Sequence, residues 1–177
     1  GLDPRDRNKG RPSLRQLILG ANGIEVLIGG TGREQLFLLG FAQILRDAGI
    51  TANKVQIFQY PVKERWYCLG MCDLETMADR PRPTRLTERL LRRLTHVWSV
   101  VCENAPDGLF QLHAAASPVP EFGYIHRALD DLVTSYPAER SGLTLADERL
   151  LAALPQDWTT AARVIGRAMM GDGQGRT

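Results

Sequence analysis

The segment between Ile24 and Tyr60 constrains the fold of this chain more than any other. Its pattern is that of a strand, a glycine-rich loop, an apolar helix and a second strand, at residues 24–28, 29–32, 34–48 and 54–60. Two strands joined by a helix over this length pair in parallel through a right-handed crossover. The sequence therefore predicts an α/β fold class, with a small parallel βαβ sheet layer at the N-terminal side.

The rest of the chain is predicted to be helical and to end in a helix-turn-helix-like pair. A proline pair in Arg80-Pro81-Arg82-Pro83 marks the best boundary, because proline does not continue a helix. We expect an α/β domain with a polar tail at 1–83, a helical segment packed on it at 84–137, and a helix-turn-helix-like segment with a frayed tail at 138–177.

The loop after the first strand is the first candidate site. Backbone N–H groups at a helix N-terminus form a ready anion site, and the predicted ligand-binding residues are Gly30, Thr31, Gly32, Arg33 and Gln35. The loop lacks the lysine of a P-loop and the third glycine of a dinucleotide fingerprint. Thr31 and Glu34 instead fit a capping box. A capped helix start and a loop for a small anionic ligand both stay open.

The crossover helix is apolar nearly all the way round, so it is expected to be buried on more than one side. Gly40 in its middle predicts the close approach of a neighbouring backbone. The next long helix is predicted to be capped by Thr84 and to place leucine, valine and tryptophan on one face. Its other face carries Arg85, Arg89, Arg92, Arg93 and His96, which fits either a solvated surface or a grip on phosphates.

The C-terminal segment contains a second capping box, Thr144 to Asp147, and a final helix that starts at Thr159 or Thr160. We expect Val164, Ile165, Ala168 and Met169 on the buried side of that helix. Arg163 and Arg167 lie four residues apart and share an exposed face. Two short helices joined by a turn can place such a face in a DNA groove, so the predicted nucleic-acid-binding residues are Thr160, Arg163 and Arg167. An ordinary helical hairpin is the alternative.

The composition excludes some classes of function. With 24% charged residues, a net charge of +2 and no apolar run of about 20 residues, the chain has no predicted membrane span. The odd cysteine count, at Cys68, Cys72 and Cys102, does not suggest a disulfide framework, so a cytoplasmic location is expected. These thiols and three histidines have no zinc-site spacing. We therefore predict no metal site and no cofactor.

Several stretches resemble the uncharacterised bacterial family called domain of unknown function 1835, with its C-terminal companion, domain of unknown function 3658. The most specific is Tyr-Pro-Ala-Glu-Arg-Ser-Gly-Leu-Thr at 136–144, followed by Glu-Arg-Leu-Leu at 148–151. Residues 25–45, 69–84 and the helix ending near Trp98 add to the resemblance. It implies a fold and a bacterial, intracellular setting but supplies no activity. The family's usual first strand with a histidine, and its C-terminal wing, are not evident.

The functional expectation is a binding or regulatory module, with DNA or a protein as partner and DNA contacted by the C-terminal helices. The alternative is an enzyme or sensor that binds a phosphorylated or nucleotide ligand at Gly29 to Gln35. No histidine, cysteine or paired carboxylate stands at a spacing that identifies a nucleophile or general base. The chain is therefore expected to lean away from catalysis. An interaction domain would need only an exposed apolar patch.

Overall fold

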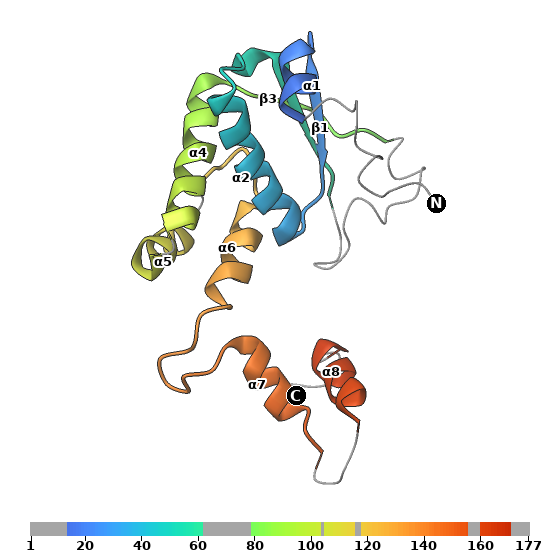
Figure 1. The fold of residues 1–177 in the computed structure, drawn as a ribbon, viewed down its shortest axis with the longest axis vertical. Coiled ribbons are helices and arrows are strands. Elements are labelled where there is room, and N and C mark those ends of the chain that lie inside the picture. Colours follow the sequence, from blue (N-terminus) through green and yellow to red (C-terminus); the bar gives the residue numbers. More distant parts are fainter. Residues whose placement is uncertain (1–13, 62–78, 104, 116–117, 156–159, 171–177) are drawn as a thin grey trace, which may run out of the picture. The chain divides into compact units, whose positions relative to one another are not determined.

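The computed structural model describes residues 14–61, 79–103, 105–115, 118–155 and 160–170 (Figure 1). The chain divides into two compact units, Gly1–Leu129 and Asp130–Thr177. The first unit is an α/β layer with a small sheet, and the second contains helices. The predicted α/β fold class is therefore confirmed.

The sheet is built on the predicted βαβ segment. Strand β1 (Ile24–Ile28) pairs in parallel with β2 (Val55–Gln59), in a register that places Ile24 opposite Val55 and Ile28 opposite Gln59. Helix α2 (Gly32–Asp47) is the crossover, and Gly49 follows its C-cap with a φ of 66°, a conformation that glycine adopts without strain. The short 3₁₀ turn η2 (Ala52–Lys54) leads into β2.

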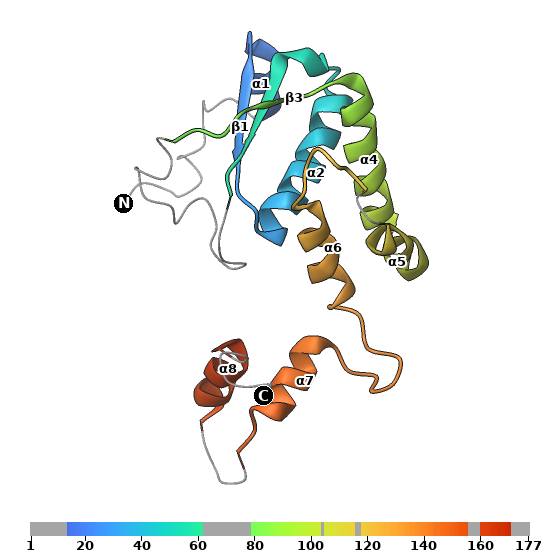
Figure 2. The same ribbon diagram turned by 180° about the vertical axis from the view of Figure 1, so that it is seen from behind.

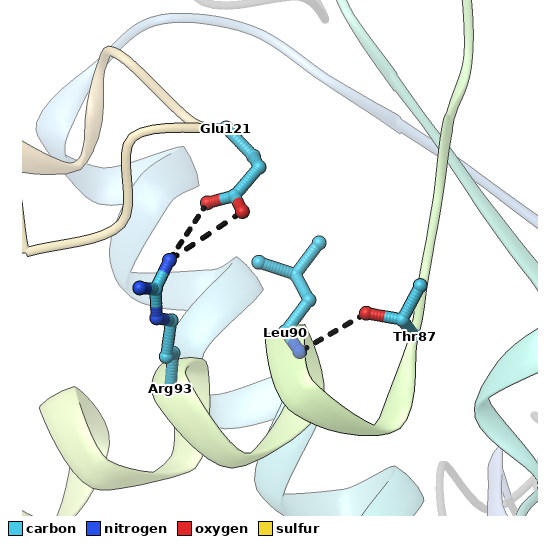
Figure 3. A network of polar contacts seen from close by, with 4 residues as sticks. All are labelled: Thr87, Leu90, Arg93 and Glu121. Atoms are coloured by element: carbon cyan, nitrogen blue, oxygen red, sulfur yellow. Dashed lines mark hydrogen bonds and ion pairs between the residues drawn. The ribbon is translucent and has the colours of Figure 1, made fainter.

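A third strand makes the sheet mixed, which the sequence did not predict. Strand β3 (Thr84–Arg85) pairs antiparallel with β2, so the strand order is β1-β2-β3. Thr84 was expected to cap a helix, and this expectation is wrong. Helix α4 (Glu88–Glu103) begins after Thr87, whose hydroxyl accepts a hydrogen bond from the Leu90 amide at 3.2 Å (Figure 3). The extended backbone at 84–86 buries Leu86 and lets its amide bond the Val55 carbonyl.

Helices α2 and α4 lie side by side in both views (Figures 1 and 2) and form the main helical contact of the first unit. Their buried side chains include Leu38, Leu39, Leu45, Leu90 and Leu94, each at most 3% exposed. Burial on this scale is the main source of stability in a domain. The crossover helix contacts both β1 and α4, as expected of a helix buried on more than one side, while Phe37 is 55% exposed and Ile44 is 38% exposed.

The close neighbour of Gly40 is a side chain and not a backbone. A Cβ at this position would lie 3.3 Å from the Trp98 ring. The glycine therefore makes room for the indole of α4 against α2, which corrects the expectation of a backbone approach.

Three further helices belong wholly or partly to the first unit. They are α1 (Leu14–Gly20), α5 (Pro106–Ala114) and α6 (Ile125–Val133). Ile18, Leu109 and Ile125 are their buried anchors. Helix α6 continues past Leu129 into the second unit.

The second unit contains α7 (Leu145–Ala152) and α8 (Ala161–Met170), which contact each other. Val164 and Ala168 are buried, as expected. Ile165 and Met169 are not buried, with exposed fractions of 50% and 81%, so half of the predicted inner face of α8 is open. An eight-residue helix and a ten-residue helix do not supply enough neighbours to cover both apolar sides.

Candidate functional site

The loop between β1 and α2 is held closed by its own side chains. The Thr31 hydroxyl donates to Glu34 Oε2 at 2.7 Å and accepts from the Glu34 amide at 3.3 Å, while the Thr31 amide donates to the same carboxylate. This is the capping box predicted from the sequence. The Glu34 carboxylate therefore stands where an anion would bind at a helix N-terminus.

Gly30 is covered by residues far along the chain. A Cβ on Gly30 would lie 3.1 Å from the ring of Tyr124. The Arg127 guanidinium donates to the Gly30 carbonyl at 3.1 Å and lies 4.7 Å from the centre of the Tyr124 ring, within the range of a cation–π contact. The start of α6 thus packs on the loop and fills the space above Gly30.

The Gln35 side chain forms hydrogen bonds beside the loop on its buried side. Its side chain is fully buried, its amide donates to the Gly29 carbonyl at 2.6 Å, and its carbonyl accepts from Gln59 at 3.3 Å. A buried polar group must be paired in this way to avoid a large desolvation cost. Gln35 consequently ties the ends of β1 and β2 together at the carboxyl edge of the sheet.

The five predicted ligand-binding residues are therefore adjacent but face different ways. Gly30, Thr31, Gly32 and Gln35 are buried, and Arg33 alone among them is exposed. The polar groups described above are satisfied by Glu34, Gln59 and Arg127. The geometry favours a structural loop, and ligand binding at this loop stays a prediction.

Tyr124 and Arg127 were not singled out by the sequence. They lie more than ninety positions beyond the loop, and no local pattern links them to it. Their place follows from tertiary packing, with Val119, Phe122 and Ile125 buried around them. The sequence does not show that a larger residue at Gly30 would collide with an aromatic ring, because that ring comes from a distant part of the chain.

The predicted nucleic-acid-binding residues of the second unit are Arg163 and Arg167 on α8 and Thr160 directly before it. Thr160, Arg163 and Arg167 are all exposed. At 3.6 residues per turn, the two arginines project within about 40° of each other, and Ile165 and Met169 project about 160° away. The buried stripe of Val164 and Ala168 lies between them. Helix α8 therefore presents a basic side and an apolar side, both open.

Hydrogen bonds to Asp147 lower the pKa of its carboxyl group. The hydrogen bond from the Thr144 hydroxyl, at 2.6 Å, lowers the pKa of Asp147 below its usual value of 3.8, and the bond from the Thr144 amide lowers it further. Both bonds favour the charged form. This shift belongs to the second capping box, which is confirmed at the start of α7.

Other candidate chemistry is sparse within the described ranges. No three histidine, cysteine or acidic side chains gather there in a way that could hold a metal ion. Cys102 is exposed, while Cys68 and Cys72 fall outside the described residues. An open hollow of about 300 Å³ lies near the amino ends of β1 and β2, lined by Gly23, Ile24, Glu25, Lys54 and Gln56. It does not include the predicted loop.

None of the helices in the described ranges combines the length and apolar character that a membrane crossing requires. Comparisons of the chain with known protein families, with curated proteins and with solved structures find no match. The resemblance noted from the sequence therefore stays a prediction.

Proposed function

We propose that this chain is a binding module and that α7 and α8 carry the surface for a protein partner. The proposal is supported by large apolar side chains that are exposed on α7, just after its end and on α8. The exposed fractions are 54% at Leu151, 56% at Leu154, 50% at Ile165 and 81% at Met169.

The energetics favour a partner for this surface. Burying a leucine or methionine side chain stabilises an assembly by about 1.5 to 3 kcal/mol, and grouped apolar side chains on a surface mark interaction sites. The structure describes all eight residues of α7, and none of them is buried. The helix is held by its capping box and by contact with α8. The partner that fits is a protein that presents an apolar helix face or groove.

A photo-reactive residue at position 151 or 169 tests this proposal, with position 139 as an exposed control on the same unit. We expect discrete cross-linked products from 151 and 169 and none from 139. The purified partner should then bind the chain, and Leu151→Glu with Met169→Glu should weaken that binding at least tenfold. Equal products at all three positions, or unchanged binding by the double variant, would contradict the proposal.

DNA is the second candidate partner, through Thr160, Arg163 and Arg167. The exposure of both arginines on the side of α8 opposite Ile165 and Met169 supports it, because that side can approach phosphates freely. The charge balance opposes it, since residues 130–177 contain seven acidic side chains and five arginines.

Mobility shifts at two salt concentrations separate the two partners. DNA binding should weaken in Arg163→Gln with Arg167→Gln and persist in Arg140→Gln, and it should fall as salt rises. An absence of binding at the lower salt concentration would remove DNA and leave the protein partner. A cytoplasmic, regulatory role is part of this proposal and rests on the cysteine content and the binding surfaces alone.

A further inference from the structure

A second charged surface lies in the first unit, on the outer face of α4. Arg89, Arg92 and His96 are exposed and project within about 60° of one another around the helix axis. Leu90, Leu94 and Val97 occupy the buried side. Arg85 on β3 is also exposed and precedes the helix by one turn's length of chain. We call Arg85, Arg89, Arg92 and His96 the α4 basic face.

A cation from α2 lies beside this face. The Arg46 guanidinium donates to the Thr95 hydroxyl at 3.3 Å, and that hydroxyl donates to the Arg92 carbonyl at 3.1 Å. Because α2 and α4 run side by side (Figure 1), Arg46 extends the positive surface across both helices.

Within the described residues, the arginines of this face and its neighbour Arg93 differ in their ion pairing. Arg93, next to the α4 basic face, forms an ion pair with Glu121 at 3.4 Å (Figure 3). The side chains of Arg85, Arg89 and Arg92 form no ion pair or hydrogen bond with the described part of the chain. Residues 1–129 contain 17 lysines and arginines and 13 acidic residues, so this part of the chain carries a net positive charge.

We propose that the α4 basic face, with Arg46, binds the phosphate backbone of a nucleic acid. Arginine forks suit phosphate oxygens. The stretch from Arg89 to His96 rises about 10 Å along the helix, which matches about three phosphates at the axial spacing of one strand. No base-reading group is part of the surface, so the contact is electrostatic and independent of sequence. This site contains no residue of α7 or α8.

Fluorescence anisotropy with a labelled single-stranded RNA, a single-stranded DNA and a DNA duplex, each about 20 nucleotides or base pairs long, tests the proposal between about 50 and 200 mM salt. The variant Arg85→Gln/Arg89→Gln/Arg92→Gln should lose at least about tenfold in affinity at the lower salt. A plot of the logarithm of the binding constant against the logarithm of the salt concentration has a negative slope. For this variant the magnitude of that slope should be smaller by about 2 on single strands and by about 3 on the duplex. The arm with the tightest binding identifies the form of nucleic acid.

The matched control is Lys54→Gln/Arg140→Gln/Arg149→Gln, which removes the same net charge from exposed positions elsewhere. It should keep the salt slope of the unmodified chain. Arg163→Gln with Arg167→Gln should keep it too, which distinguishes this site from the α8 proposal. Replacement of Arg85, Arg89 and Arg92 by lysine should restore the slope, because the positive charge returns.

A gain of binding provides an independent test. Glu121→Gln releases Arg93 beside the α4 basic face, so it should tighten binding and steepen the slope by about 1. The proposal is overturned if the unmodified chain binds none of the three probes at low salt, or if the α4 variant keeps the original slope. Equal competition by polyglutamate at matched charge would assign the surface to an acidic protein and also overturn it.

Discussion

The two units of this chain differ in how their helices are stabilised. In the first unit, α2 buries seven residues against the sheet and α4, and Leu39 and Leu94 are fully buried. In the second unit, α7 buries none of its residues and α8 buries Val164 and Ala168. Both α2 and α7 begin with a threonine capping box. The same local signal therefore starts a core helix in one unit and an exposed helix in the other.

This contrast shows that capping and burial are independent properties. A cap fixes where a helix begins by pairing its first amides, whereas burial depends on what the rest of the chain supplies. The first unit supplies a sheet and a second long helix. Among its described residues, the second unit supplies one short helix, α8, that contacts α7, and Leu151 stays 54% exposed.

Core truncation should give the largest difference between the units. Leu39→Ala should lower the free energy of unfolding of the first unit by about 2 to 5 kcal/mol, because a cavity forms at a fully buried site. Leu151→Ala, at a 54% exposed site, should cost less than about 1 kcal/mol. Urea titrations followed by circular dichroism measure both. Equal losses would mean that α7 is buried in solution.

Removal of the buried amide at the carboxyl edge of the sheet should have the next largest effect. Gln35→Leu leaves the Gly29 carbonyl and the Gln59 amide without their partner, which should cost about 1 to 3 kcal/mol. Gln43→Leu, on the exposed side of the same helix, is the control. If Gln35→Leu were neutral and abolished binding of a nucleotide or sugar phosphate, the loop would be a ligand site and not a structural tie.

The two capping boxes allow a direct comparison. Thr31→Ala and Thr144→Ala should each destabilise their helix, within the range of about 0.5 to 2 kcal/mol measured for such caps. The larger loss is expected at Thr31, which is 7% exposed. Hydrogen exchange of the first-turn amides of α2 and α7 reports each loss separately. A larger loss at Thr144 would show that the cap alone holds α7.

The smallest effect should be the pH dependence of α7. The pKa of Asp147 is lowered in the folded chain, so its contribution is present above the unfolded value near 3.8 and is lost as the pH falls through the folded pKa. Fraying of α7 should therefore begin below about pH 4. Carboxyl chemical shifts measure the titration, and Asp147→Asn should remove it. A midpoint above 3.8 would contradict the observed hydrogen bonds.

The sequence predicted the features of the fold that depend on neighbouring residues. The parallel strands, the crossover helix and both capping boxes follow from local patterns at 24–60 and 144–147, and the structure confirms them. Thr84 was misassigned because an extended Thr-Arg-Leu and a capped helix start look alike when the partner strand is unknown. Strand β3 depends on β2, whose paired residues lie 27 and 29 positions earlier.

The candidate site was less predictable because it, too, depends on residues that are distant in sequence. Arg33 and Gln35 lie two positions apart in sequence. Arg33 is exposed, whereas Gln35 is buried and donates a hydrogen bond to the Gly29 carbonyl. The residues that close the loop are Tyr124, just before α6, and Arg127 on α6, and the sequence predicted this part of the chain only as a helical segment at 84–137. Ile165 and Met169 have the right spacing for burial, yet a stripe pattern cannot state how much neighbouring surface exists to cover it.

The bond between Arg127 and the Gly30 carbonyl joins positions 97 residues apart, and this separation bears on how the protein is made. During synthesis, β1, α2 and β2 leave the ribosome well before α6. The loop at Gly30 must wait for Tyr124 and Arg127 to emerge before it is covered. A nascent chain arrested before residue 118 should therefore expose this loop. Pulse proteolysis should cut such stalled chains at the loop, and the cleavage should stop in chains long enough to include Tyr124 and Arg127.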